Sequence, residues 1–337
     1  MAFKKSKKSS VSLETPTSLF NDLKTRKIPA LFAHQDKILQ DFTANVGVPN
    51  VALQLPTGSG KTLIGMLIAE WKRRKYTERV VFVCPTKQLA YQASNEANEK
   101  YAIKAICFTG SKKDYEQKDM MAYQNAEAVA VISYSSLFNI KPFFNDADTI
   151  IFDDAHAAEN YISKLWSLEV NRHTDAVLFR ALADILKPKL TNQNYRRLTK
   201  DAKAPDDHLW VDKLSYPDFL ELVPELSDVI EAHIEDSTLK YSWAMIRDHL
   251  SACHLYIGFS QILIRPLIPP TSFFPPMDGA KQRVYMSATL GEGGDLERIF
   301  GQANIKRLET PDGWDKQGIG RRYFMFPARS LEREFEQ

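Results

Sequence analysis

The sequence predicts an α/β fold built on a mostly parallel sheet and interrupted by a mostly helical insertion. Short apolar runs alternate with helical patterns in the first half of the chain. A long, glycine-poor helical stretch follows, and one more apolar run returns near the C-terminal end. Hydrophobic residues make up 44% of the 337 residues and charged residues 26%, which is ordinary for a globular protein.

Five apolar runs in the first half have the composition of buried strands. They are rich in Val, Ile and Phe and alternate little, as expected for parallel strands covered on both faces. Helical patterns at 63–75 and 87–100 separate the first three runs. Because the carboxyl ends of parallel strands meet at one edge of the sheet, we expect ligands at that edge. The strands are predicted at 51–55, 80–84, 105–108, 128–132 and 149–152.

The pattern changes in the second half, where residues 175–264 are helical, poor in glycine and punctuated by prolines. A proline-rich connector at 266–276 leads from this stretch to a final predicted strand at 282–286. We therefore expect a mostly helical insertion that returns the chain to the sheet. Its helices are predicted at 177–186, 219–234 and 239–263.

Charge, cysteines and hydropathy set limits on function. The net charge of +2 is small, so any contact with nucleic acid must come from local clusters of Lys and Arg. Cys84, Cys107 and Cys253 are too scattered for a disulfide framework or a zinc site, which indicates buried free thiols in a reducing cytoplasm. No stretch approaches the ~20 apolar residues of a membrane span. We expect a cytoplasmic protein without membrane contact, whose basic residues 1–20 form a disordered tail.

The strongest motif lies between the first strand and the helix that follows it. Gly58 and Gly60 let the backbone curl so that its N–H groups face a phosphate, and the helix N-terminus adds positive potential. Lys61 can reach the β- and γ-phosphates of ATP, and the Thr62 hydroxyl can ligate Mg²⁺. A chance glycine-rich turn is the alternative, but strand, loop, Lys-Thr pair and helix all coincide here. The residues expected to hold ATP in this P-loop are Pro56, Thr57, Gly58, Ser59, Gly60, Lys61 and Thr62.

A second motif follows the strand at 149–152, which ends in Asp153-Asp154-Ala155-His156. An apolar strand that delivers an acid to the edge of the sheet is how a Walker-B carboxylate reaches magnesium. Asp153 is therefore the predicted Mg²⁺ ligand, directly or through water, and Asp154 the group that orients and deprotonates the attacking water. His156 is expected to direct a hydrogen bond towards the nucleic-acid side. An Asp-Asp pair after a strand is also a common helix cap, and the P-loop is what favours catalysis. The predicted catalytic residues are Lys61, Asp153, Asp154 and His156.

These two motifs resemble those of superfamily 2 DEAD/DEAH-type helicases, in their first RecA-like, ATP-binding domain. The resemblance implies ATP and Mg²⁺ as cofactors, and ATP hydrolysis coupled to a grip on a nucleic-acid strand. Gln35 lies ahead of the P-loop and resembles the Q-motif glutamine that hydrogen-bonds adenine. Ser287-Ala288-Thr289 resembles motif III, which couples the ATP site to the nucleic-acid groove.

Further motifs of that family follow the ends of predicted strands. The segment 85–92 is similar to motif Ia, Thr109-Gly110 to the TG motif, and the segment beginning at Ser133 to a third strand-contacting block. Hydroxyls, backbone N–H groups and a lysine at such an edge can hold phosphates without reading bases. Each residue alone is equally consistent with an ordinary cap or turn. The residues expected to contact nucleic acid or to couple it to ATP are Pro85, Thr86, Lys87, Thr109, Gly110, Ser133, Ser287, Ala288 and Thr289.

Two departures from the family pattern matter. The family box is most often Asp-Glu, and Asp154 is one methylene shorter, so the rival hypothesis is a non-catalytic ATP-gated clamp or adaptor. The family also closes ATP between two RecA-like domains, and too few residues follow Thr289 for a second domain. We therefore expect a first-domain fragment with weak activity alone, whose partner is the second RecA-like domain. Gly320-Arg321-Arg322 follows motif III too soon to be an arginine finger, whereas 323–326 could begin the second domain.

The insertion between His156 and Ser287 resembles the arch of the XPD/DinG group of helicases. That group's iron–sulfur cluster needs four cysteines between motifs Ia and II, and only Cys107 lies there, so no cluster is expected. Expected partners are nucleic acid, with DNA favoured over RNA, and a protein bound by the insertion. A metabolic P-loop kinase is another hypothesis for such a loop, and it is rejected because motif Ia and motif III accompany the P-loop. The expected parts are a tail at 1–20, a RecA-like domain at 21–170, the helical insertion at 171–265, and the return with a linker at 266–337.

Overall fold

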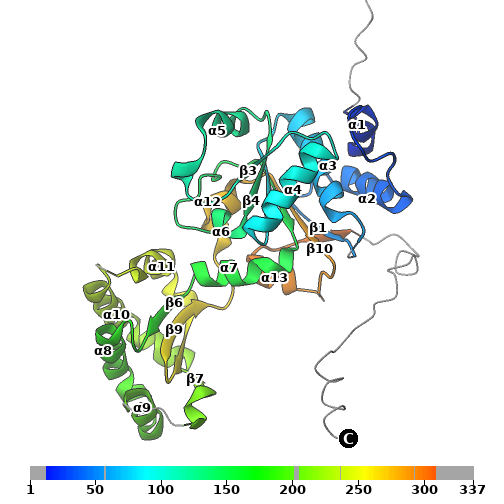
Figure 1. Ribbon diagram of the computed structural model, residues 1–337. Helices are drawn as coiled ribbons and strands as arrows, with labels where there is room; N and C mark the ends of the chain where they lie inside the picture. Colours follow the sequence, from blue (N-terminus) through cyan, green and yellow to red (C-terminus); the bar gives the residue numbers. More distant parts are fainter. Residues whose placement is uncertain (1–12, 57, 201–204, 236, 292, 309–337) are drawn as a thin grey trace, which may run out of the picture.

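The protein has two parts in its computed structural model, which describes residues 13–56, 58–200, 205–235, 237–291 and 293–308. Figure 1 shows a large sheet flanked by helices, with a smaller helix-rich unit beside it. Within the described residues, none of the helices is both long and apolar enough to span a bilayer.

The large sheet has seven strands in the order β11-β1-β10-β5-β2-β4-β3, and every neighbouring pair is parallel. The α/β class and the six predicted strands are confirmed, and the short edge strand β11 was not predicted. Parallel strands covered on both faces explain why their sequences are almost continuously apolar. The strands are β1 (Asn50–Gln54), β2 (Val80–Cys84), β3 (Ala105–Phe108), β4 (Val129–Ser133), β5 (Thr149–Asp153), β10 (Gln282–Ser287) and β11 (Lys306–Leu308).

Helices cover both faces of this sheet, and each face has its own apolar core. The first four helices pack on one face, and α5, α6, α7 and α13 pack on the other. The helices predicted at 63–75 and 87–100 are confirmed as α3 and α4. The helices are α1 (Pro16–Asp22), α2 (Ala33–Ala44), α3 (Lys61–Tyr76), α4 (Lys87–Glu99), α5 (Gln117–Gln124), α6 (Tyr134–Leu137), α7 (Ala158–Leu165), α12 (Pro275–Gly279) and α13 (Asp295–Phe300).

The expected disordered tail is too long. Helix α1 begins at Pro16, its N-cap Thr15 accepts a hydrogen bond from the backbone of Ser18, and Leu19 and Phe20 are buried in the core. A proline in the first turn and a threonine cap are common helix-start signals, and they were overlooked because the preceding lysines dominate the segment. Residues 1–12 of the expected tail lie outside the described part of the chain.

The smaller unit is the insertion, and it contains an antiparallel sheet in the order β6-β9-β8-β7 as well as helices. The helices predicted at 177–186 and 219–234 are confirmed as α8 and α10. Its elements are β6 (Leu168–Asn171), α8 (Ala176–Leu186), α9 (Asn192–Thr199), β7 (Val211–Lys213), α10 (Tyr216–His233), α11 (Leu239–Ile246), β8 (Cys253–Gly258) and β9 (Gln261–Pro266).

The long helix predicted at 239–263 is wrong. Helix α11 ends at Ile246, and the chain then forms the hairpin of β8 and β9. Burial alternates along both strands, with Leu255 and Ile257 facing inwards on β8 and Ile262 and Ile264 on β9. An apolar stretch of this kind satisfies both a helical and a strand pattern, so periodicity alone did not separate them.

Close packing between α3 and the sheet depends on a glycine. A Cβ atom on Gly65 would lie 2.6 Å from the Phe82 ring and 2.6 Å from the Met286 side chain, so the missing side chain lets α3 approach β2 and β10. The buried Phe82 ring has little room to move.

We predict that Gly65→Ala destabilises the protein although alanine favours helices. Overpacking of about 1–3 kcal/mol should exceed the ~1 kcal/mol gained in helix propensity. Urea unfolding measures the difference. Gly47→Ala is the matched control, because a Cβ there meets nothing within 4 Å. A Gly65→Ala protein that is as stable as the control would contradict this packing.

Candidate functional site

The strand order brings the separate sequence motifs to one edge of the sheet. Strand β10 lies between β1 and β5, with Gln54 opposite Ser287 and Met286 opposite Asp153. The backbone N–H of Leu55 donates to the Ser287 carbonyl at 2.8 Å. The start of the P-loop, motif III and the first aspartate of the Asp-Asp box are therefore neighbours, although they come from distant parts of the chain.

The P-loop has the backbone that its glycines predict. Gly58 and Gly60 have φ values of 85° and 81°, a left-handed conformation that favours glycine. Helix α3 begins directly at Lys61, so Lys61 and Thr62 form its first turn, where helix N–H groups and the dipole favour an anion. Both side chains are partly exposed, and Ser59 is buried. Thr57 lies outside the described residues.

Gln35 supports the P-loop from beneath. Its Nε2 donates to the Ser59 carbonyl at 2.9 Å, and its Oε1 accepts from the backbone N–H of Phe32 at 3.0 Å. The side chain is only 3% exposed. In this structure the Gln35 amide therefore holds the loop that carries Gly58 and Gly60, and the adenine contact stays a prediction.

Asp153 ends β5, and its side chain is partly buried. Its Oδ1 is buried and has no hydrogen-bond partner within the described part of the chain. Burial raises the pKa of this carboxyl from 3.8 to about 6, an effect opposed by the charge of Lys61 and strengthened by that of Asp154. A buried, unpaired carboxylate oxygen is unfavourable unless a cation neutralises it.

The oxygen groups at this edge fit a magnesium ion. Mg²⁺ prefers oxygen ligands and uses few from the protein, keeping water and substrate phosphates for the others. The unpartnered Oδ1 of Asp153 and the hydroxyl of Thr62 are oxygen groups of this kind. The positive charge of Lys61 is close enough to lower the pKa of Asp153, against the effect of burial. Thr62 and Asp153 are thus the residues that could hold the ion.

The turn after Asp153 is unusual and is held by a residue that the sequence did not single out. Asp154 has φ 52° and ψ 61°, which is a strained, left-handed conformation for a residue other than glycine. The buried Tyr134 hydroxyl donates to the carbonyl of Asp153 at 3.0 Å and that of Asp154 at 3.5 Å. Tyr134 was overlooked because only the serines around it matched a motif.

His156 connects the Asp-Asp box to motif III. Its Nδ1 lies 3.1 Å from the Ser287 Oγ, which joins the segment after β5 to the end of β10. Ala288 and Thr289 follow β10, and Thr289 is exposed. The His156 side chain therefore links the segment after the Asp-Asp box to the end of β10.

The residues predicted to touch nucleic acid lie at the ends of β2, β3 and β4. Thr86 caps α4 by accepting a hydrogen bond from the backbone of Leu89 at 3.2 Å, and Lys87 next to it is exposed. The Pro85 carbonyl accepts from the Tyr161 hydroxyl at 2.8 Å. The Thr86 and Pro85 groups thus stabilise the edge, and the Lys87 ammonium is available to a phosphate.

The other two strand ends differ from each other. Gly110 has φ 92° and is exposed, and Thr109 before it donates its hydroxyl to Tyr91 at 2.7 Å. Ser133 is only 2% exposed, and its hydroxyl bonds those of Ser135 and Ser136. Helix α6 begins directly after β4, so the Ser133 side chain is covered here, and its contact with a strand stays a prediction.

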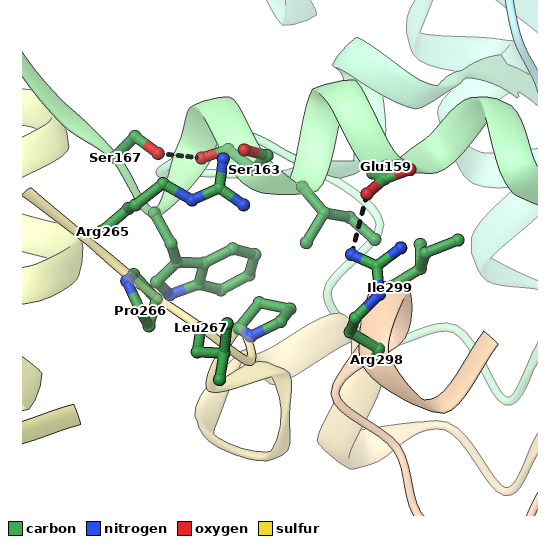
Figure 2. A pocket seen from close by; sticks show the side chains of 11 residues that line it. Glu159, Ser163, Ser167, Arg265, Pro266, Leu267, Arg298 and Ile299 are labelled. Atoms are coloured by element: carbon green, nitrogen blue, oxygen red, sulfur yellow. Dashed lines mark hydrogen bonds and ion pairs between the residues drawn. The ribbon is translucent and has the colours of Figure 1, made fainter. Parts of the chain in front are cut away.

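A small pocket of about 20 Å³ lies at the joint between the sheet and the insertion (Figure 2). The Arg298 guanidinium of α13 pairs with the Glu159 carboxylate of α7 at 2.9 Å; Trp166 caps the end of α7, and Arg265 belongs to β9 of the insertion. None of the predicted site residues lines this pocket. It lies where the helices that follow the Asp-Asp box and motif III meet the base of the insertion.

Asp153→Asn should stabilise the ligand-free protein above pH 6. A carboxyl whose folded pKa is raised contributes stability below its unfolded pKa of 3.8 and loses it as pH rises through about 6. Asparagine is neutral throughout, so the gain should approach roughly 3 kcal/mol above pH 7 and fall below about 1 kcal/mol near pH 4. Urea unfolding in EDTA at both pH values measures it. The exposed Asp248 provides the control, with Asp248→Asn near wild type throughout, and a pH-independent effect of Asp153→Asn would contradict the account.

Comparison with known proteins places the chain in a family. The model of the ResIII family, described as "Type III restriction enzyme, res subunit", matches residues 28–203, and no curated protein matches the chain. The chain is similar to the structure "XPD_APO", with 18% identity and a TM-score of 0.49 over 81% of this chain and 56% of that one. It is also similar to Xpd4 of S. tokodaii (16% identity, TM-score 0.46, 82% and 60% covered) and to the UvsW helicase of bacteriophage T4 (23%, 0.31, 43% and 52%).

The chain thus spans less than two thirds of these solved proteins. The family model, in contrast, covers more than half of this chain, including the P-loop and the Asp-Asp box. The chain therefore belongs to the ResIII family and contains a superfamily 2 helicase-type RecA-like domain.

Proposed function

We propose that this chain is the ATP-binding half of a helicase or translocase motor, in which ATP hydrolysis is coupled to a grip on single-stranded nucleic acid. The observation that carries the proposal is the meeting of the P-loop, Asp153 and Ser287 at the ends of three adjacent strands. A nucleotide at that edge would contact the loop, the carboxylate and the coupling motif at once.

The site residues would have separate roles in ATP binding and hydrolysis. The backbone N–H groups around Gly58 and Gly60, together with Lys61, would hold the phosphates. Thr62 and Asp153 would hold Mg²⁺, which supplies positive charge to the β- and γ-phosphate oxygens when bound. Asp154 would orient the attacking water and accept its proton, in a position fixed by the Tyr134 hydroxyl.

Coupling would run through the contact between His156 and Ser287. This pair joins the catalytic turn to the end of β10, the strand that lies between the nucleotide-binding strands. A shift of the Asp154 turn upon hydrolysis would move motif III directly. Motif III would then alter the grip of Lys87, Thr109 and Gly110 on the phosphates of a strand.

The partners follow from the same edge. Single-stranded nucleic acid, with DNA favoured over RNA, would lie across the ends of β2 and β3. A second RecA-like domain would close over the ATP and complete the catalytic site, so turnover by this chain alone should be weak. The insertion provides a surface for a protein partner.

A clamp that binds ATP without hydrolysing it is the second candidate, and the short Asp154 side chain favours it. Its carboxylate is one methylene shorter than the usual glutamate, and its backbone is left-handed. Such a protein would close on a strand with ATP and release it by exchange of nucleotide.

ATP turnover with and without single-stranded oligonucleotides tests the motor. We expect weak turnover that a strand stimulates, and loss of nearly all ATP binding in Lys61→Ala, because the phosphates lose their only P-loop cation. The Asp154→Glu variant is compared with wild type in protein that contains the second RecA-like domain. If ATP turnover is robust in both and changes little, the result supports the motor. A large gain in Asp154→Glu favours the clamp, and no saturable ATP uptake by the wild type excludes both.

A further inference from the structure

An exposed aromatic ring lies at the strand-facing edge. Tyr91 of α4 is 54% exposed and follows Lys87 by one helical turn, so the two side chains share a face of the helix. Its hydroxyl accepts a hydrogen bond from the Thr109 hydroxyl at 2.7 Å. The phenol is therefore tethered at one end to the turn that follows β3, while much of its surface faces solvent.

Other exposed tyrosines in the protein pack on neighbouring groups. The ring of Tyr76 lies edge-on to Trp71 at 5.4 Å between centroids, and the Tyr241 ring lies 5.7 Å from the Lys240 ammonium. For Tyr91 no comparable ring or cation contact occurs within the described residues, and its hydroxyl is bonded to that of Thr109. A large planar side chain that is anchored but uncovered is suited to a planar ligand.

The surroundings of Tyr91 favour a polyanion. Lys87 follows β2, and Lys112 and Lys113 follow β3; all three are exposed, and the Lys112 ammonium lies 5.1 Å from the centre of the Phe143 ring. The Gly110 turn exposes backbone to an approaching ligand. The carboxylate of Asp114 accepts from the backbone N–H of Ser111, so part of its hydrogen-bonding capacity is used within the turn. Cations beside a free aromatic face are the combination by which proteins bind single strands, with phosphates held by charge and bases by stacking.

We propose that Tyr91 is a stacking platform for one base of the bound strand, an inference that rests on the proposed function. Lys87 and the Thr109-Gly110 turn would hold the phosphates on either side, and the Thr109 hydroxyl positions the ring. A base in a duplex is already stacked on both faces, so the platform selects an unpaired strand. Every base has a π-face, so Tyr91 adds affinity without sequence preference.

Fluorescence anisotropy with a labelled oligothymidylate and an abasic oligomer of equal length tests the platform on the full chain. Tyr91→Leu removes the ring and should weaken binding of the thymidylate by at least about fivefold. Tyr91→Phe keeps the ring and should stay within about twofold of wild type, because stacking needs no hydroxyl. Tyr241→Leu is the matched control, since Tyr241 is 53% exposed on the insertion, and it should bind as wild type does.

The abasic oligomer separates stacking from support of the backbone. Wild type should bind it more weakly than the thymidylate, and Tyr91→Leu should weaken that binding no further. If Tyr91→Leu loses the same affinity for both oligomers, Tyr91 only supports the Thr109 turn. If Tyr91→Leu binds the thymidylate as wild type does, the platform is also overturned, while the proposed function stays intact. If the wild type binds neither oligomer, the proposed function fails and the platform with it.

Discussion

The parallel pairing of β10 between β1 and β5 is the constraint on which the candidate site depends. This strand comes after the whole insertion, yet it separates the P-loop strand from the strand that carries Asp153. Its position is fixed at the opposite end as well, where the Gln282 amide donates to the Val46 and Val48 carbonyls and the backbone N–H of Arg283 donates to Pro49. The first and last strands of the insertion, β6 and β9, pair with each other, so the insertion begins and ends at neighbouring points.

The candidate site also contains two locally unfavourable features. Asp153 has a buried oxygen without a partner, and Asp154 has a left-handed backbone. Buried tyrosine and glutamine side chains compensate by fixing the nearby backbone, since Tyr134 holds the Asp153–Asp154 turn and Gln35 holds the P-loop. Binding of a metal–nucleotide complex would relieve the charge on Asp153, so the ligand-free site is organised in advance at some cost in stability.

The sequence predicted the sheet well because its signals are local. Buried parallel strands are short apolar runs, and the glycines of the P-loop mark a backbone that other residues rarely adopt. The hairpin of β8 and β9 was mistaken for a helix because apolar periodicity is ambiguous there. Tertiary contacts were not predictable in this way: nothing in the sequence shows that the Tyr134 hydroxyl reaches the end of β5, that Ser133 turns inwards, or that Tyr91 meets Thr109.

The magnesium dependence of ATP affinity tests most directly whether the three strand ends form one nucleotide site. Calorimetric titration of the full chain with ATP, with and without Mg²⁺, would be compared between wild type and Asp153→Asn. The account predicts that Mg²⁺ strengthens binding by about tenfold or more in the wild type and has little effect in the variant, because the ion loses its protein carboxylate. An equal effect of Mg²⁺ on both proteins would show that Asp153 does not share a site with the P-loop.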